Sequence, residues 1–224
     1  MEFMLSEEQR ALQESISRFL TAECPLDRVR KAADAEETYA EDVHQGLCAL
    51  GISGILVPEE YGGVGLGFLE AALVAEALGG AVAPVPYTAS CVMAPIALRA
   101  GGSAEQQDRW LPGLAAGEIC MGVGLTEQIG RRESQGISEA SGLLTGRAMF
   151  VIEGMEANAF IVADNAGTLY IVEGEANGLT RTKLKTIDRT RSVVELNLDQ
   201  TPADVLEKTQ GNPAALHATT DAGR

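Results

Sequence analysis

The chain has 224 residues, of which 46% are hydrophobic, so it is long enough for one large or two modest domains with packed cores. Its 32 acidic and 17 basic residues give a net charge of −15, which disfavours binding to nucleic acid or to an anionic membrane surface. The local basic positions that remain as candidate contacts for a phosphorylated cofactor are Arg131, Arg132 and the segment from Arg181 to Arg191.

Cysteine usage and the amino terminus favour a reducing, cytoplasmic environment. The amino terminus lacks the basic and apolar regions of a signal peptide, and no apolar run approaches the ~20 residues that span a bilayer. His44 and His217 are expected at the surface, and no metal site is predicted around either. Buried free thiols are favoured over a disulfide or metal set, because the cysteines are widely spaced and lie in or beside apolar segments. These cysteines are Cys24, Cys48, Cys91 and Cys120.

Helical periodicity begins at the amino terminus. Ser6 and Gln9 form a capping-box pattern at the start of an amphipathic helix that ends before Pro25. A second helix is expected from Leu26 to Ala35. A third is expected to end at Gly51, because a residue without a Cβ suits a helix C-cap.

Glycine and proline separate the helices that follow. Glycines between positions 62 and 67 permit a sharp loop, after which the alanine-rich segment from Phe68 to Leu78 favours a helix. The segment from Thr88 to Ala100 predicts another buried helix. A capping box then starts a helix from Ala104 to Leu111, and Pro112 predicts a break in the chain.

After Cys120 the periodicity changes to that of strands. Asp164 to Gly167 is a hairpin signal between two apolar runs. The predicted architecture is α+β, with an all-α helical domain over 1–118, an antiparallel β-domain over 119–208, and a linker with the start of a helix over 209–224. The expected strands, rich in β-branched or aromatic residues, lie at 143–145, 149–152, 160–163, 168–172 and 193–198.

Four motifs follow one another in a characteristic order. They are Val57 through Gly65 (VPEEYGGVG), Gly102 through Glu118 (GSAEQQDRWLPGLAAGE), the Leu125-Thr126-Glu127 turn, and Gly146 through Asn158. This ordered set resembles the acyl-CoA dehydrogenase family over essentially the whole chain. The resemblance implies a flavoprotein that oxidises an acyl-CoA thioester to the 2,3-enoyl-CoA, with electrons passing to FAD and then to an electron-transfer flavoprotein.

The same resemblance implies which residues would contact the flavin. Leu125 and Thr126 would contact its pyrimidine end, and Phe150 would form an aromatic wall on one face. From the residues alone, Phe150 is equally compatible with a place in the core, and Thr126 with a simple turn. The implied cofactor-binding set is Leu125, Thr126, Phe150, Val151 and Ile152, with Arg132 as an alternative clamp for a pyrophosphate.

Two hypotheses follow from differences within these motifs. The family has glycine and serine where this chain has Arg131 and Arg132, and threonine and asparagine where it has Ile152 and Glu153. The first hypothesis is an FAD-dependent acyl-CoA dehydrogenase, and the second is a non-catalytic degenerate subunit or fragment that stabilises a flavin-bearing partner. The family's C-terminal four-helix domain would begin near Arg224, so no catalytic base is assigned and association with a like or related subunit is expected.

Overall fold

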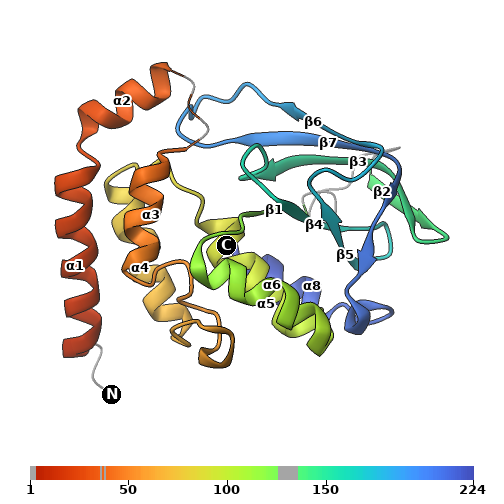
Figure 1. The fold of residues 1–224 in the computed structure, drawn as a ribbon, viewed down its shortest axis with the longest axis horizontal. Coiled ribbons are helices and arrows are strands. Elements are labelled where there is room, and N and C mark those ends of the chain that lie inside the picture. Colours follow the sequence, from red (N-terminus) through yellow and green to blue (C-terminus); the bar gives the residue numbers. More distant parts are fainter. Residues whose placement is uncertain (1–3, 36, 38, 126–135) are drawn as a thin grey trace.

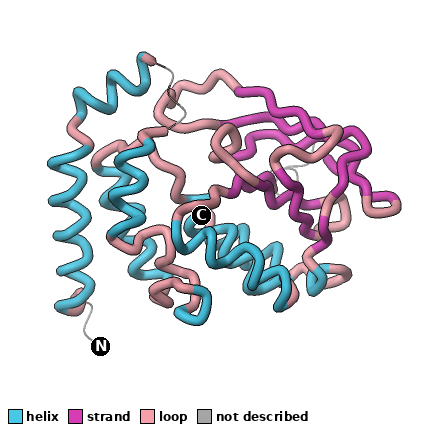
Figure 2. The backbone as a smooth tube through the Cα atoms, in the orientation of Figure 1, coloured by secondary structure: helices cyan, strands magenta, loops and turns pink. Residues whose placement is uncertain are grey.

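The computed structural model describes residues 4–35, 37, 39–125 and 136–224. Within these residues, a block of helices packs against an eight-stranded sheet (Figures 1 and 2). Helices come first and strands follow, except for a last helix that returns to the helical block. The predicted α+β class is therefore confirmed.

The predicted helix starts are confirmed by their caps. Ser6 Oγ accepts a hydrogen bond from the backbone amide of Gln9 at 3.1 Å, and Ser103 Oγ accepts one from the amide of Gln106 at 3.3 Å. Each cap satisfies an amide that the first helical turn leaves without a partner. The helices are α1 (Glu7–Glu23), α2 (Leu26–Asp34), α3 (Glu41–Ala49), α4 (Phe68–Gly80), α5 (Ala94–Gly101), α6 (Ala104–Ala116) and α8 (Ala214–Ala222), with shorter helical turns η1 (Glu59–Tyr61), η2 (Thr88–Met93) and η3 (Glu207–Thr209).

The predicted break at Pro112 is wrong, because α6 continues to Ala116. Proline removes the amide that would bond to the carbonyl of Asp108, but both residues are exposed, so water can hydrate that carbonyl. The helix ends instead at Gly117, which adopts a left-handed φ of 72°.

The strands form one sheet in the order β6-β7-β3-β1-β4-β5-β8, with β2 paired to β3. The hairpin predicted at Asp164–Gly167 joins β4 to β5 and is confirmed. All pairs are antiparallel except β1 with β4, which run parallel, so the sheet is mixed rather than purely antiparallel. The strands are β1 (Met121–Gly124), β2 (Gly136–Ala140), β3 (Leu143–Ile152), β4 (Ala159–Ala163), β5 (Leu169–Glu173), β6 (Leu179–Lys183), β7 (Val193–Pro202) and β8 (Asp204–Val205).

Side-chain alternation places a separate core on each face of the sheet. Ile161 and Ile171 join the apolar cluster that the sheet shares with α5, α6 and α8. Their strand neighbours Phe160 and Val172 join a second cluster on the opposite face. A third cluster lies among α1 to α4. Because helices and sheet share a core, η2 and α5 pack directly against β1, and the proposed domain boundaries at 118 and 208 stay a prediction.

Candidate functional site at the end of strand β3

Phe150 occupies a strained position near the end of β3. The register of β3 on β7 shifts between Ala148 and Val151, which marks a β-bulge. At this bulge Phe150 has a φ of 55° and its side chain is 43% exposed. A left-handed backbone costs a bulky residue roughly 1–2 kcal/mol and persists only where the surrounding structure imposes it. The bulge therefore holds an aromatic ring at the surface of the sheet.

The other predicted contacts lie at the paired ends of β1 and β3. Ile152 pairs with Val123 in antiparallel register, and Leu125 follows directly after β1. Leu125 is buried in the cluster between helices and sheet, and the half-buried Ile152 packs against the same cluster. Val151 points to the opposite face, where it is completely buried among strand residues.

Two of the predicted site residues, Thr126 and Arg132, lie outside the described residues, as does Arg131. Their assignment to the flavin or to a phosphate stays a prediction. Leu125 and Ile152 are the predicted contacts that share one apolar cluster, whereas the Phe150 ring is exposed at the bulge two residues before Ile152.

Glu153 fastens the end of β3 to the helical block. It is only 4% exposed, and its carboxylate accepts hydrogen bonds from the backbone amides of Tyr87 at 2.8 Å and Ser90 at 2.9 Å. These amides lie at the start of η2, where unpaired donors favour a negative charge. Burial raises the pKa of Glu153, and the backbone donors oppose that shift. Sequence reasoning noted Glu153 only as a replacement for asparagine and missed this role.

A second buried acid follows in the connection to β4. Burial raises the pKa of Glu156 to about 7, a shift that the hydrogen bond from the Ser192 hydroxyl opposes and the nearby charge of Glu153 increases. Two carboxyl groups therefore follow the end of β3, and hydrogen bonds from protein groups, rather than contact with water, stabilise their ionised forms.

A cavity of about 560 Å³ lies in the helical block. Its wall is formed by α4, η2 and the last residues of the chain, and it includes Phe68, Tyr87 and Thr88. The backbone amide of Tyr87 is bonded to Glu153, so one wall of the cavity is fixed to the end of β3. Its mostly aliphatic and aromatic lining suits an apolar chain.

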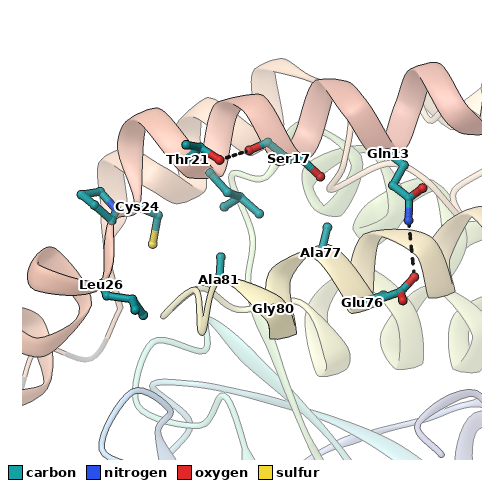
Figure 3. A pocket seen from close by; sticks show the side chains of 11 residues that line it. Gln13, Ser17, Thr21, Cys24, Leu26, Glu76, Ala77, Gly80 and Ala81 are labelled. Atoms are coloured by element: carbon teal, nitrogen blue, oxygen red, sulfur yellow. Dashed lines mark hydrogen bonds between the residues drawn. The ribbon is translucent and has the colours of Figure 1, made fainter.

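Another cavity, of about 570 Å³, lies between α1 and α4 (Figure 3). Its lining includes Leu20, Cys24 and Ala77, and Gln13 donates a hydrogen bond to Glu76 at 3.4 Å near its end. All its lining residues come from helices and the Pro25 corner, so it belongs to the helical block rather than to the strand site.

Both cysteine and histidine predictions have mixed outcomes. All four cysteines are free, and three are buried, whereas Cys48 is only half-buried. His217 is exposed as predicted, but the surface position expected for His44 is wrong. His44 is 6% exposed, because its ring packs edge-on against Tyr39 and lies beside the carbonyl of Gly117. Over the described residues, no group of three or more histidine, cysteine or acidic side chains is placed to hold a metal ion.

The comparison with protein families decides the assignment. The family described as "Acyl-CoA dehydrogenase, N-terminal domain" matches residues 6–118. This chain belongs to the acyl-CoA dehydrogenase family. The helix that follows the predicted VPEEYGG motif and the capped helix α6 both fall inside the matched region.

Related acyl-CoA dehydrogenases extend the similarity into the sheet. Acyl-CoA dehydrogenase FadE27 of Mycobacterium tuberculosis is 30% identical over 220 residues, which cover 96% of this chain and 59% of FadE27. The ChsE4-ChsE5 complex of Mycobacterium tuberculosis contains a chain that is 28% identical with a TM-score of 0.83, covering 97% of this chain and 61% of that one. A steroid ACAD, the Tcur3481-Tcur3483 G363A variant, gives 26% identity and a TM-score of 0.79, with 97% and 60% coverage.

The described residues of this acyl-CoA dehydrogenase-family chain include an aromatic ring suited to stacking on FAD but no hydroxyl at Ile152. The exposed ring of Phe150 suits stacking on a flat isoalloxazine face. Ile152 carries no hydroxyl and is turned into an apolar cluster, so it offers no side-chain hydrogen bond.

The helices also bear on whether the chain could cross a membrane. Among the residues described, we find no helix with the length and apolar character needed to cross a membrane. The expected cytoplasmic location stays a prediction.

Proposed function

We propose that this chain takes part in the FAD-dependent α,β-dehydrogenation of an acyl-CoA thioester. The observation that carries the proposal is Phe150, a bulky residue held exposed in a left-handed conformation where β1 and β3 meet. An aromatic residue under backbone strain is retained where its ring has a task that the core does not supply. When bound, FAD accepts the β-hydrogen of the thioester as a hydride.

Within this proposal, each described residue has a physical task. The exposed Phe150 ring would stack on one face of the flavin and exclude water from it, while Leu125 and Ile152 belong to the apolar cluster between sheet and helices. The cavity beside Tyr87 receives the acyl chain. Glu153 keeps the cavity wall and the strand end in a fixed relation, so that acyl chain and flavin meet in one geometry.

The proposed partners follow from the same chemistry. They are an acyl-CoA substrate, an electron-transfer flavoprotein that reoxidises the flavin, and a like or related acyl-CoA dehydrogenase subunit. The net charge of −15 argues against nucleic acid as a further partner. No residue of the described part is proposed as the catalytic base.

Flavin content tests the proposal directly. The chain is purified alone and after co-expression with a related subunit, and its visible spectrum is measured. A flavin absorption band is expected, and Phe150→Ala should lower the retained FAD by about tenfold, because a stacking contact is worth roughly 1 kcal/mol or more. A matched control is Leu69→Ala, which removes an exposed apolar side chain from α4 and lies outside the lining of the proposed acyl-chain cavity.

The proposal fails if no preparation carries flavin, or if Phe150→Ala and Leu69→Ala retain FAD equally well. Thioester dehydrogenation by a complex that contains the chain, measured with an artificial electron acceptor, extends the test from cofactor binding to activity.

A second candidate function is a degenerate subunit that stabilises a flavin-bearing partner. The observation that favours it is Ile152, whose aliphatic side chain joins the core at the strand end and leaves a flavin edge without a side-chain hydroxyl. The proposal is also supported by similarity to the ChsE4-ChsE5 complex, which contains two different chains.

Substitution at Ile152 separates the two functions. Ile152→Thr restores a hydroxyl, and it should increase FAD retention if this strand end contacts flavin. Ile171→Thr is the matched control, since Ile171 packs in the same cluster from β5. If Ile152→Thr gains nothing while the wild-type chain co-purifies with a flavin-bearing relative and raises its thermal stability, the stabilising role is favoured.

A further inference from the structure

We infer that the thiol of Cys48 is a nucleophile and that His44 acts as its base. The electrophiles to which this thiol adds are small, neutral or cationic α,β-unsaturated carbonyl compounds. The site is a pocket lined in part by residues of α3. Figure 1 shows where this helix lies in the fold. It is separate from the end of β3, and the inference does not depend on flavin binding.

Helix geometry places the two side chains together. His44 and Cys48 are four residues apart on α3, so they lie one above the other on the same face. The thiol sulfur is 3.5 Å from Nε2 and 3.9 Å from Nδ1 of the imidazole. The ring is packed edge-on against Tyr39, and the carbonyl of Gly117 lies beside it, so its orientation is fixed.

Both side chains are neutral at pH 7, and both pKa shifts oppose a free thiolate, so the sulfur proton must move to nitrogen as the carbon–sulfur bond forms rather than before it. Burial lowers the pKa of His44, so the ring is neutral at pH 7 and has a free lone pair. Burial also raises the pKa of Cys48, while a hydrogen bond with Ser53 opposes the shift. A neutral thiol beside a neutral imidazole needs a base to react, and the neighbouring ring nitrogen is that base.

Access distinguishes Cys48 from the other three thiols. A pocket of about 500 Å³ is lined by both His44 and Cys48, and Cys48 is the cysteine that is not fully buried. Burial raises the pKa of Cys120 to about 12 and that of Cys91 well above its ordinary value. Cys24 is 4% exposed, and the charged groups that act on its thiol are Arg28 and Asp42.

Close approach of the backbone shapes the floor of this pocket. Gly117 has a φ of 72°, and a Cβ atom added there would lie 2.2 Å from the sulfur of Cys48. Only glycine leaves room for the thiol at this point, so the sulfur sits against backbone on one side and the pocket on the other.

Charge at the pocket selects the electrophile. Glu41 and Glu118 are exposed residues of its lining. In a chain of net charge −15, these carboxylates repel anionic reagents, CoA thioesters among them, and attract cations. Neutral or cationic electrophiles therefore reach Cys48 in preference to anions.

The proposed addition balances without an external oxidant or leaving group. The sulfur of Cys48 forms a bond to the β-carbon of the unsaturated carbonyl compound, and the thiol proton moves to Nε2 of His44. The electron pair of the carbon–carbon double bond moves toward the carbonyl, and the α-carbon then takes the proton back from the imidazole. The product is a thioether and a neutral histidine.

The first test uses N-ethylmaleimide on the folded full chain, with mass spectrometry to follow each cysteine separately. Cys48 should be labelled about tenfold or more faster than each of Cys24, Cys91 and Cys120. Equal or faster labelling of Cys24 would overturn the inference, because burial alone would then set the order.

A second measurement examines the base. His44→Gln should lower the labelling rate of Cys48 by about tenfold or more at pH 7. The wild-type rate should be nearly level from about pH 7 to 8, where His44 is already neutral, whereas the variant rate should rise with pH as thiolate forms. A structural role alone would change the rate but leave the two pH profiles parallel, and that result would refute His44 as the base.

Other titratable groups around the thiol do not produce the same profile. Tyr39, Cys91 and Cys120 have raised pKa values and stay neutral over this range. Glu41 and Glu118 are the carboxylates that line the pocket. If His44→Gln does not fold, the charge test below still decides the inference.

The charge test compares two methanethiosulfonate reagents, one with an aminoethyl and one with a sulfonatoethyl group, against Cys48. The cationic reagent should react about threefold or more faster, after correction for their rates with the unfolded chain. Glu41→Gln with Glu118→Gln should reduce that ratio and leave the maleimide rate unchanged. A ratio that the double substitution does not move would contradict the assigned pocket.

Discussion

The end of β3 and the pocket beside α3 each bury a titratable side chain, but they use it differently. Glu153 is enclosed and accepts hydrogen bonds from two backbone amides, so its carboxylate is occupied in holding two elements together. His44 is almost as buried, yet its imidazole lies beside a half-buried thiol that lines the same pocket. The strand end is built to stay fixed, whereas the helix pocket leaves a reactive atom within reach of solvent.

This contrast separates buried groups that stabilise the fold from groups that remain free to contact a ligand. A buried polar group that meets all its hydrogen-bonding needs internally stabilises the fold and has little capacity left for a ligand. Beside Glu153, the group available for ligands is therefore Phe150, while in the pocket it is Cys48. The following substitutions test that division, from the largest expected effect to the smallest.

Removing the carboxylate of Glu153 should have the largest effect. Glu153→Ala leaves the amides of Tyr87 and Ser90 without an acceptor, and each unsatisfied buried donor costs about 1–3 kcal/mol. We expect the free energy of unfolding, measured with urea, to fall by about 2–5 kcal/mol. Glu153→Gln should lose less, because an amide oxygen still accepts one of the bonds.

A loss below about 1 kcal/mol for Glu153→Ala would mean that the two amides find other partners. The comparison with His44 would then lose its basis, since Glu153 would not be the residue that holds the strand end.

The pH dependence of stability should reveal Glu156. Its pKa rises from the ordinary value of 4.5 to about 7 on folding, so between these values the folded chain binds more protons than the unfolded chain. Stability must then decrease as pH rises from about 4.5 to 7, by about 1–3 kcal/mol from this residue. Urea unfolding at several pH values should show a smaller decrease for Glu156→Gln, and parallel curves would contradict the assignment.

Phe150→Gly should separate stability from the proposed cofactor role. Glycine adopts the left-handed φ at no steric cost, and the phenylalanine side chain is substantially exposed, so little burial is lost. We expect a gain of about 0.5–1 kcal/mol in the free energy of unfolding together with a loss of retained FAD. A destabilised variant would instead indicate that the ring belongs to the core.

Cys48→Ala should have the smallest effect on stability. Cys48 is half-buried and contributes one weak S–H···N bond, so the free energy of unfolding should change by less than about 1 kcal/mol. The same substitution should abolish the fast labelling phase with N-ethylmaleimide. A large loss of stability would make the thiol a packing group like the three buried cysteines.

Local chemistry made much of the helical block predictable. The capping boxes at Ser6 and Ser103 set helix starts, and the hairpin at Asp164–Gly167 set one strand connection, because each depends on residues within a few positions. The ordered motifs likewise indicated the family that the comparison with known families later showed. The spacing of His44 and Cys48 was also present as a one-turn repeat, although it was not recognised.

What the tertiary structure decided depends on contacts between distant segments. The parallel pairing of β1 with β4 joins strands far apart in sequence. The strand β1 is too short for its sequence pattern to indicate which strand it pairs with. Glu153 is buried because residues 63 and 66 positions earlier direct backbone amides at it, and the bulge that exposes Phe150 arises from pairing with β7. Sequence determined the helices, the strand segments that became β3, β4, β5 and β7, and the family, since those signals are local. Tertiary structure decided which polar groups are enclosed and which stay reachable, because burial depends on what packs against each residue.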